Sequence, residues 1–484
     1  MTKNCRALFD QWNNAVRYCH WKSNEHLVEG LCGKTDLDIL MSDADKEVGR
    51  KILSNVGFMK CCTQYGSRYP DVEDWLGYDE DSGRLIHVHL HFKIVTGHKG
   101  MKEYNLPYTS LALETRILDK ETNVYVCEPN LELVILYTRL GLKVSPAVHI
   151  EAIIGAYKMS NDIKRELDYL KARVDKSSVE EIVRMFWGKA ADKIITLIWE
   201  DIITTKSILK IKQIAENSFK LFRRWSAIGT ISRKYYFFVA LKLRDILKRK
   251  YGVIIRTRKA AGRMPGLKVA FLGQDGSGKS TITNDIIKWL GWKLEVKRFY
   301  FGSGDHFNPW QKRLYKSLSN KEGTLRGVVC GTLKIWLYYK WSSYIKRTIR
   351  RAERYSKKGG IAIFDRFPQT QFHGINDGPK LRIVAQERIK SIILRKIALM
   401  LAKIEERRVV KVSSNEPDIV FKLLLPVEES HRRKPKERIE SIEKKHTIIN
   451  QLTFKRAKVY NIDATQNYDD ELKLIKTIIW QQIQ

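Results

Sequence analysis

The chain has 484 residues, too many for one typical domain, and 43% of them are hydrophobic, which is enough to build more than one core. Lysine and arginine number 88 against 54 aspartates and glutamates, so the formal net charge is +34. This excess favours anionic partners, whether nucleotides, nucleic acid or an anionic membrane surface. The odd number of cysteines and the lack of a signal-peptide pattern argue against a disulfide-rich secreted domain. We therefore expect a cytoplasmic chain that reaches a membrane only at its surface, because its longest apolar run is too short to cross one.

Two aspartates near the N-terminus share one predicted strand. Asp36 and Asp38 follow Gly33 in the stretch CGKTDLDILMSD and are separated by Leu37. Because side chains alternate along a strand, both carboxylates lie on one face and Leu37 lies on the other. Two carboxylates on one face repel each other unless a cation lies between them. Asp36 and Asp38 are therefore predicted to bind a divalent metal ion.

Three histidines alternate along a later strand. The stretch RLIHVHLHFKIV aligns His87, His89 and His91 on one face. Histidine binds zinc and other transition metals well, but it replaces a carboxylate poorly around Mg²⁺. The metal chemistry of this region is therefore not settled by the aspartates alone.

The glycine-containing turn and the D-x-D strand together resemble the nucleotidyltransferase superfamily over about residues 1–145. The resemblance implies an α+β domain in which a later strand supplies a third carboxylate. The histidine strand stands where that carboxylate is expected, so a degenerate or regulatory domain is favoured over active nucleotidyl transfer. The carboxylates that can compensate from a loop are Asp71, Glu73 and Asp74.

Residues 146–262 form a second region, in which helical spacing dominates and basic residues accumulate. The stretches KSILKIKQIAENSFKLFRRW and ISRKYYFFVALKLRDILKRKYG are typical of it. The string RTRKAAGRMPG then ends in Pro265 and Gly266, which break a helix. This string is predicted to be a linker to the third region, 263–484.

The stretch LKVAFLGQDGSGKSTI, residues 267–282, contains the P-loop pattern. Gly273 is followed by four residues and then by Gly278, Lys279 and Ser280, with an apolar strand before and a helix after. Glycines let successive backbone amides curl around an anion, and the helix adds free N–H groups. Lys279 is expected to reach the β- and γ-phosphates of ATP, and Ser280 to offer its hydroxyl to Mg²⁺. The predicted ATP-binding residues are Gly273, Asp275, Gly276, Ser277, Gly278, Lys279, Ser280 and Thr281.

A second apolar strand, residues 361–364 in GGIAIFDRFPQT, ends in Asp365 and Arg366. The carboxyl end of a parallel strand is where a doubly wound sheet opens its ligand crevice. Asp365 is a candidate for the Mg²⁺ shell, and Arg366 is a candidate for bidentate hydrogen bonds to a phosphate. An ordinary surface turn is the alternative for this dipeptide taken alone.

A third strand, residues 419–425, precedes the basic stretch HRRKPK, which contains Arg432 and Arg433. Basic residues gathered after a strand can close over a triphosphate, and the alternative is the solvated face of an amphipathic helix. The stretch VYNIDATQ, residues 459–466, predicts a last strand before a terminal helix.

The order FLGQDGSGKST, FDRFP, LLLPVEESHRRKP and YNIDA resembles the thymidylate kinase family of P-loop nucleoside monophosphate kinases over about residues 266–484. The resemblance implies an α/β domain with a parallel sheet flanked by helices. It also implies ATP with Mg²⁺ as cofactors and transfer of the γ-phosphoryl group to an acceptor phosphate. The predicted organisation is thus three regions, 1–145, 146–262 and 263–484.

The same resemblance implies roles for individual residues. Asp275 is implied to lie near the acceptor's sugar hydroxyl, and the Asp-Arg pair to hold the metal shell and the acceptor phosphate. Ser277 stands where some members carry a P-loop arginine, which implies that basic residues of a lid supply it instead. The predicted catalytic residues are Lys279, Asp365, Arg366, Arg432 and Arg433.

The acceptor is less defined than the donor. The segment HGINDGPKL, residues 373–381, resembles a loop of thymidylate-kinase-like proteins encoded beside bacterial surface-polysaccharide genes, which implies a sugar phosphate or another anion. Residues 299–314 do not supply the thymine-reading side chains of authentic thymidylate kinases. A nucleoside monophosphate, thymidylate included, stays open as the acceptor.

Three function classes remain open. An ATP-dependent small-molecule kinase fused to a nucleotidyltransferase-like module is favoured, because the DRFP and RRKP elements occur in the family's order. A nucleic-acid-binding P-loop ATPase is supported by the charge and by aromatics among basic residues, but no helicase-type motif accompanies them. A membrane-surface assembly factor with basic helices is the third class. The oligomeric state is not defined by the sequence.

Overall fold

The chain forms two compact units, Met1–Ile255 and Arg256–Gln484, named unit one and unit two here. The computed structural model describes residues 1–61, 69, 71–98, 101–200, 203–251, 266–302, 324–373, 378–387, 389, 391–435 and 437–484. Three predicted segments fall outside these residues in whole or in part, namely the linker up to residue 265, the stretch 303–314 and residues 374–377. Among the described residues no single helix is long and apolar enough for a bilayer crossing, although Pro129–Leu142 and Pro146–Ile153, bent by 85°, meet that test together.

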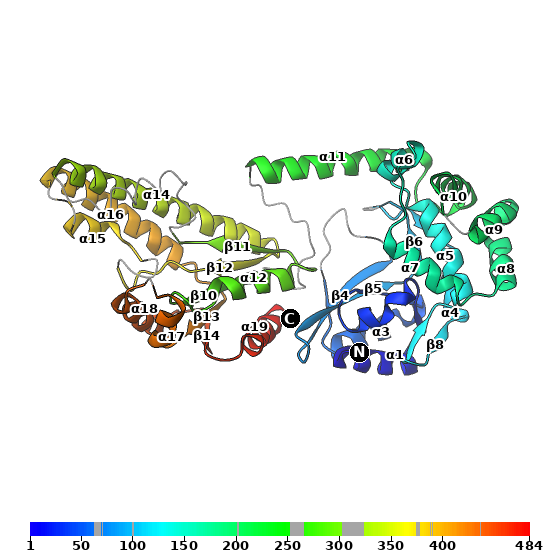
Figure 1. Ribbon diagram of the computed structural model, residues 1–484, viewed down its shortest axis with the longest axis horizontal. Helices are drawn as coiled ribbons and strands as arrows, with labels where there is room; N and C mark the ends of the chain where they lie inside the picture. The colour runs from blue at the N-terminus through cyan, green and yellow to red at the C-terminus, as the bar shows by residue number, and fades with distance from the viewer. Residues whose placement is uncertain are drawn as a thin grey trace. The chain divides into compact units, whose positions relative to one another are not determined.

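Unit one is built on a seven-stranded mixed sheet with the strand order β3-β4-β5-β2-β1-β9-β8. Figure 1 labels β4, β5 and β8 of this sheet. β2 pairs in parallel with β5, and β5 pairs antiparallel with β4. This register places Asp36 opposite His87 and Asp38 opposite His89, with Asp74 on the other side of His89. The D-x-D strand and the histidine strand are therefore neighbours. The strands are β1 (Tyr18–His20), β2 (Asp36–Met41), β3 (Met59–Lys60), β4 (Val72–Asp79), β5 (Arg84–His91), β8 (Ile117–Asp119) and β9 (Val124–Val126).

Helix α1 (Lys3–Ala15) shows how the first helices attach to this sheet. Its buried side chains are Cys5, Leu8, Phe9 and Trp12. They recur at helical spacing and form one apolar stripe, which packs in a common core with β2, β4 and β5. The other short elements of this part are α2 (Leu27–Leu31), α3 (Lys46–Asn55), β6 (Val95–Thr96), β7 (Tyr104–Asn105) and α4 (Thr109–Glu114).

Helix α5 (Pro129–Leu142) joins the sheet to the helices that follow it. Nearly all of α5 is buried, so neighbours must cover it on every side. It packs against α7, α8 and α10, and one hydrophobic cluster runs from Cys19 in β1 to Phe219 after α10. The structure thus differs from the division expected between residues 145 and 146, because the helices on both sides of it share one core. These helices are α6 (Pro146–Ile153), α7 (Asn161–Lys171), α8 (Lys176–Trp187), α9 (Ala191–Trp199), α10 (Thr205–Ser218) and α11 (Ala227–Tyr251).

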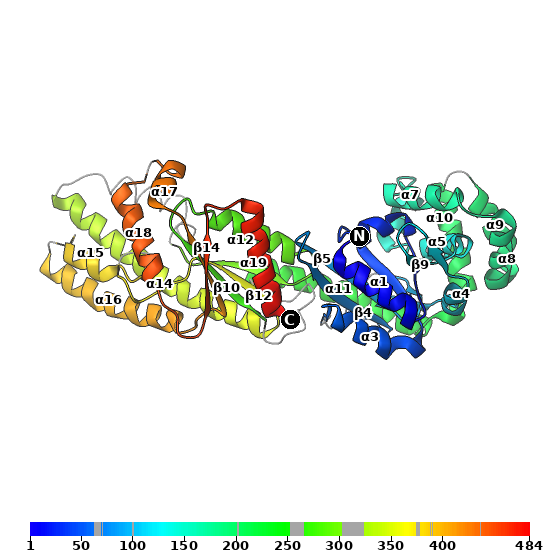
Figure 2. The same ribbon diagram turned by 90° about the horizontal axis from the view of Figure 1, so that it is seen from below.

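Unit two contains a five-stranded parallel sheet with the order β11-β12-β10-β13-β14. Its central strands are apolar runs buried along most of their length, as expected when helices cover both faces. Helices α12, α14 and α18 pack on these strands (Figure 2). The predicted α/β architecture of this part is confirmed. The elements are β10 (Lys268–Gly273), α12 (Lys279–Leu290), β11 (Val296–Tyr300), α14 (Thr324–Lys357), β12 (Ile361–Asp365), α15 (Leu381–Glu387), α16 (Ile392–Ser413), β13 (Ile419–Leu424), α17 (Val427–Arg433), α18 (Ile439–Gln451), β14 (Lys458–Asp463) and α19 (Tyr468–Ile483).

The shared core of unit one predicts a large effect of Phe219→Ala. The ring of Phe219 is fully buried, and its centroid lies 5.9 Å from that of Tyr108 and 5.0 Å from that of Trp187. Removing it opens a cavity, so we expect the free energy of unfolding of unit one to fall by about 3–5 kcal/mol. Hydrogen exchange of β1 and β2 in the full chain under increasing urea measures this loss. Leu221→Ala is the control, because Leu221 is 85% exposed; equal effects of the two substitutions would contradict the shared core.

Candidate functional site

The turn between β10 and α12 has the backbone of an anion-binding loop. Gly276 and Gly278 have φ angles of +87° and +80°, in the left-handed region where other residues are strained. Gly278 is also the N-cap of α12, so the N–H groups of the first helical turn, which have no acceptor within the helix itself, lie beside the loop. Backbone donors of this kind can surround a phosphate.

A cavity of about 470 Å³ opens beside this turn. Four segments that are distant in sequence line it: the P-loop with the start of α12, the end of β11, the end of β12 and the end of α17. Such a volume is typical of a small-molecule site. The lining residues are Asp275, Gly276, Gly278, Lys279, Ser280, Thr281, Tyr300, Asp365, Arg366, Arg433 and Lys434.

Two of the predicted ATP-binding residues do not line this cavity. Gly273 is the last residue of β10 and pairs with Leu423 of β13. Ser277 is buried within the loop, and its Oγ lies 3.4 Å from Nζ of Lys279. Both residues thus support the P-loop without being exposed to the cavity.

The backbone of the P-loop holds the side chain of Lys279 in place. Its side chain is buried, and Nζ donates a hydrogen bond to the carbonyl oxygen of Gln274 at 2.6 Å. Gln274 in turn donates from its side chain to the carbonyl oxygen of Leu425, at the end of β13. The ammonium group therefore faces the cavity from a fixed position at the sheet edge.

Asp275, in the P-loop, lies next to two basic side chains. Its carboxylate forms an ion pair with Lys445 of α18, and its Oδ1 lies 3.6 Å from Nη2 of Arg366. Burial by itself would raise the pKa of Asp275, but the hydrogen bond and charge of Lys445, with the charges of Lys279 and Arg366, lower it. Lys445 was not anticipated, because it stands in a helix with no recognisable pattern around it.

Asp365 and Arg366 come together at the end of β12, as predicted. Asp365 is buried and forms an ion pair with Arg298 of β11. Arg366 has a φ of +70°, which is uncommon for a residue with a side chain, and its backbone N–H donates to the carbonyl oxygen of Phe271 at 3.2 Å. Tyr300, which is opposite Asp365 in the β11–β12 register, also lines the cavity.

Arg298 and Tyr300 were missed from the sequence. The available signal was their position at the carboxyl end of a strand, KRFYF, which reaches the same edge of the sheet as the P-loop. A strand end alone is common, so the two residues could not be separated from ordinary strand residues without the register.

Arg432 and Arg433, which are predicted to belong to a lid, take different positions. Arg433 lines the cavity, and its Nη1 lies 3.4 Å from the carbonyl oxygen of Gly276. Arg432 does not line it; its side chain is 79% exposed, and its Nε donates to Glu429 at 2.7 Å. Arg432 and Arg433 are adjacent in α17 and therefore project in different directions, which leaves Arg432 outside the cavity. Lys434, the residue after α17, also lines the cavity.

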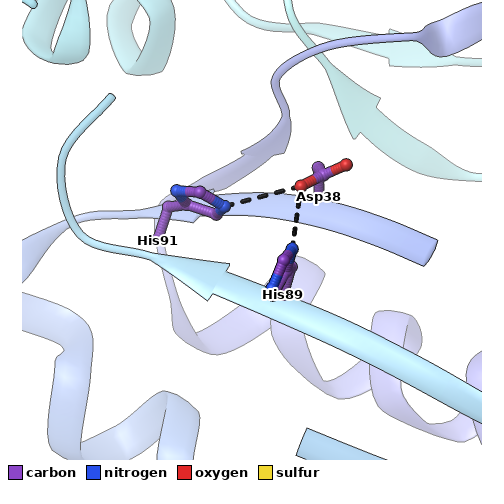
Figure 3. Close-up of side chains that lie close together, drawn as sticks. All are labelled: Asp38, His89 and His91. Carbon is purple, nitrogen blue, oxygen red and sulfur yellow. Dashed lines mark hydrogen bonds and ion pairs between the residues drawn. The ribbon is translucent and has the colours of Figure 1, made fainter. Parts of the chain in front are cut away.

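Unit one carries a second candidate site on one face of its sheet (Figure 3). Oδ1 of Asp38 lies 3.3 Å from Nδ1 of His89 and 3.5 Å from Nε2 of His91, and its other oxygen lies 2.9 Å from Nζ of Lys22. Burial would raise the pKa of Asp38, but Lys22 and the two histidines hold it well below its usual range. Burial lowers the pKa of His91 to about 3, so this ring is neutral.

A chain of contacts extends the cluster along the sheet. Nε2 of His89 lies 2.8 Å from Oδ1 of Asp74, and Nε2 of His87 lies 3.1 Å from the same oxygen. Nδ1 of His87 lies 3.0 Å from Oδ1 of Asp36. Asp36 and Asp38, the predicted metal ligands, thus each face a histidine of β5.

Asp74 joins the cluster from strand β4 rather than from the loop position expected for it. Asp71 instead pairs with Arg224 at 3.0 Å, and Glu73 forms ion pairs with Arg50 and Lys60. Alternation along β4 explains the difference between neighbours, because Glu73 and Asp74 point to opposite faces.

Comparison with known proteins concerns mainly the C-terminal part of the chain. No protein-family model matches the chain. A stretch of 222 residues is 26% identical to the Escherichia coli (strain K12) protein named uncharacterized ATP-binding protein YghR, covering 43% of this chain and 85% of that protein. A stretch of 225 residues is 24% identical to the E. coli (strain K12) protein named uncharacterized ATP-binding protein YghS, covering 42% of this chain and 89% of that protein. Deoxyadenosine kinase from M. mycoides, solved with bound dATP, is 18% identical and covers 44% of this chain and 99% of its own, with a TM-score of 0.28.

The C-terminal part of the chain resembles YghR and YghS. The finer resemblance to thymidylate kinases stays a prediction. The nucleotidyltransferase-like identity of residues 1–145 stays a prediction as well.

The contact between Lys445 and Asp275 predicts a pH effect. In Lys445→Ala we expect the pKa of Asp275 to rise, because its strongest stabilising partner is lost. The folded-state pKa of Asp275 is depressed, so its contribution to stability is present near neutral pH and is lost as the pH falls through that pKa. The variant should therefore be less stable than the unsubstituted chain at neutral pH, and the difference should shrink in acid.

Carbon-detected NMR titration of the Asp275 carboxyl group measures this shift directly. Lys444→Ala is the matched control, because Lys444 is the exposed neighbour of Lys445 on α18. An Asp275 titration curve that is the same in both variants would show that the ion pair does not set this pKa.

Proposed function

We propose that unit two is an ATP-dependent phosphotransferase that moves the γ-phosphoryl group of ATP to a phosphorylated small molecule. The observation that carries this proposal is one cavity in which the P-loop meets Asp365, Arg366, Arg433 and Lys434. Phosphoryl transfer needs positioning and neutralisation of charge more than it needs a covalent partner on the enzyme. The relatives YghR and YghS are named ATP-binding proteins, which supports a nucleotide as the donor.

The P-loop side of the cavity suits the donor. The backbone amides of the turn and the start of α12 can bind the phosphate chain, and Lys279 can contact its β- and γ-phosphates. The carbonyl of Gln274, which now accepts from Lys279, is near enough to hold the ammonium group in place until a phosphate arrives. Arg433 lies beside the P-loop, where its guanidinium group can contact the γ-phosphoryl group as it is transferred.

The residues present also fit a Mg²⁺ ion. The hydroxyl of Ser280 and the carboxylate of Asp365 are hard oxygen ligands, and both line the cavity. These two residues would hold the ion, and bound Mg²⁺ would supply neutralisation of the phosphate charge. Arg298 orients the Asp365 carboxylate through their ion pair.

The part of the cavity around Arg366 and Asp275 suits an acceptor that carries its own negative charge. Arg366 projects there from a strained backbone position and can make bidentate hydrogen bonds to a phosphate. Asp275, beside it, can accept a hydrogen bond from a sugar hydroxyl. A nucleoside monophosphate or a sugar phosphate satisfies both contacts. If the acceptor is a sugar phosphate, we propose a role in surface-polysaccharide metabolism.

A membrane-surface assembly factor is the second candidate function. Helix α11 favours it, because exposed apolar side chains stand in a sequence rich in lysine and arginine. Among the side chains of α11 that the structure describes, Ile228 is 78% exposed, Tyr235 72% and Ile231 68%. This function is compatible with a kinase in unit two, and it keeps the expected cytoplasmic location at an anionic surface.

Lys279→Ala tests the donor site. We expect phosphoryl transfer to fall by at least about 100-fold with the fold intact, because one buried cation is removed from the phosphate site. The measurement uses γ-labelled ATP, Mg²⁺ and a panel of nucleoside monophosphates and sugar phosphates. Lys288→Ala, an exposed lysine of the same helix, is the control. Undiminished transfer by Lys279→Ala would remove the P-loop assignment, and turnover that requires nucleic acid would favour the ATPase alternative.

Arg366→Asn tests the acceptor site. Asparagine tolerates a positive φ better than alanine does, so the backbone is kept while the guanidinium group is lost. We expect the KM for the acceptor to rise at least about tenfold, with the Kd for ATP little changed, because the lost contact is to the acceptor phosphate. Arg382→Ala is the control, since Arg382 forms an ion pair with Glu406 on helices outside the cavity. Equal weakening of donor and acceptor binding would contradict the assigned role.

A further inference from the structure

The separations within the cluster of Asp38, His89 and His91 in unit one are long for hydrogen bonds and match those between metal ligands. Oδ1 of Asp38 is 3.3 Å from Nδ1 of His89 and 3.5 Å from Nε2 of His91. Hydrogen bonds between nitrogen and oxygen are usually shorter than about 3.2 Å. Two ligand atoms at about 2.1 Å from a tetrahedral zinc ion lie about 3.4 Å apart. One ion between these three atoms accounts for both separations.

Asp74 fixes the proton on the other side of His89. Nε2 of His89 lies 2.8 Å from Oδ1 of Asp74, a good hydrogen-bond distance, so Nε2 carries the hydrogen. A neutral imidazole has one N–H, which leaves a lone pair on Nδ1 facing the carboxylate of Asp38. Two acceptors that face each other need a cation between them. A carboxylate behind a ligating histidine is also the usual way in which proteins orient such a ligand.

The burial of His91 is hard to explain if no ion is bound. It is fully buried, and its Nδ1 has no hydrogen-bond partner among the described residues of the chain. Its ring packs edge-on against Trp21, with 5.2 Å between ring centroids, so Nε2 is held toward Asp38 (Figure 3). Burying an imidazole in this way is costly unless its nitrogen binds something.

We propose that Asp38, His89 and His91 bind one divalent transition-metal ion of the zinc class, with Asp74 as the positioning residue behind His89. Two imidazole nitrogens and one carboxylate suit such an ion and are unsuited to Mg²⁺, which prefers oxygen ligands alone. Three protein ligands leave a further coordination position open, as in catalytic rather than structural zinc sites. The side chains of His89 and Asp38 are 21% and 13% exposed, so this position can be reached from solvent. The inference is independent of the phosphotransferase proposed for unit two.

The test is metal binding by the full chain after removal of metal with a chelator. Co²⁺ is the probe, because it takes the same ligands as zinc and its absorption spectrum reports coordination number. The expected result is one Co²⁺ per chain with a spectrum of low coordination number, displaced by Zn²⁺ and not by a thousandfold excess of Mg²⁺. Absence of binding, or displacement by Mg²⁺ at that excess, overturns the proposal; the former result would mean that His89 is instead doubly protonated between the two carboxylates.

Substitutions locate the ion. Asp38→Asn and His91→Phe should each abolish this Co²⁺ spectrum, and His91→Phe keeps an aromatic ring against Trp21. Asp74→Asn should retain the stoichiometry and weaken affinity by about 10–100-fold, the range seen when a group behind a ligand is lost. His98→Gln is the matched control, because His98 also pairs with a carboxylate, Glu103 at 2.6 Å, in the same unit.

Circular dichroism of the metal-free variants shows whether each one folds. If His91→Phe fails to fold, Asp38→Asn decides alone, since it changes one oxygen to an amide at nearly constant volume. A Co²⁺ spectrum that survives both substitutions in folded protein, or that is lost equally in His98→Gln, overturns the proposal.

Discussion

The parallel pairing of β10 with β12 on one side and β13 on the other is the constraint on which the cavity of unit two depends. Parallel strands end at the same edge of a sheet, so the segments that follow them are brought together there. The P-loop follows β10, the Asp365–Arg366 pair ends β12, and the chain after β13 leads into α17. Each segment alone is an ordinary turn or helix start. Their common edge turns them into one wall of a cavity.

Charge in and around that cavity is partly balanced by ion pairs within unit two. Asp275 is held between Lys445 and Arg366, Asp365 pairs with Arg298, and Glu429 pairs with the arginines of α17. These carboxylates offset the repulsion that the neighbouring basic side chains would otherwise exert on one another. A polyphosphate offers these cations more negative charge than the carboxylates do, so ligand binding can exchange ion pairs rather than create charge from nothing.

Unit one uses strand pairing in the same way but with a different result. Because β5 lies between β2 and β4, its histidines are flanked by Asp36 and Asp38 on one side and by Asp74 on the other. The outcome is a row of alternating carboxylates and imidazoles on a largely buried face. Such a row is stable when each imidazole can share a proton or an ion with its neighbours. This need for mutual satisfaction explains why the histidine strand sits beside the D-x-D strand, although histidine is a poor ligand for Mg²⁺.

The sequence by itself determined the local chemistry of this protein. It contains the P-loop turn, which requires glycines at positive φ, and the apolar runs of the parallel sheet. Its alternation also places Asp36 and Asp38 on one face of their strand, and the three histidines of the later strand on one face of theirs. These features depend on neighbours within a few residues, so a linear pattern records them. The tertiary structure alone decided which distant side chains meet. It paired Lys445 with Asp275 of the P-loop, brought Arg298 to Asp365 and Tyr300 to the cavity, and left Arg432 outside the cavity. It also joined the middle helices to the core of unit one and placed Asp74 behind His89. Strand order and helix rotation set those contacts, and both are fixed by burial across the whole fold rather than by any short stretch of chain.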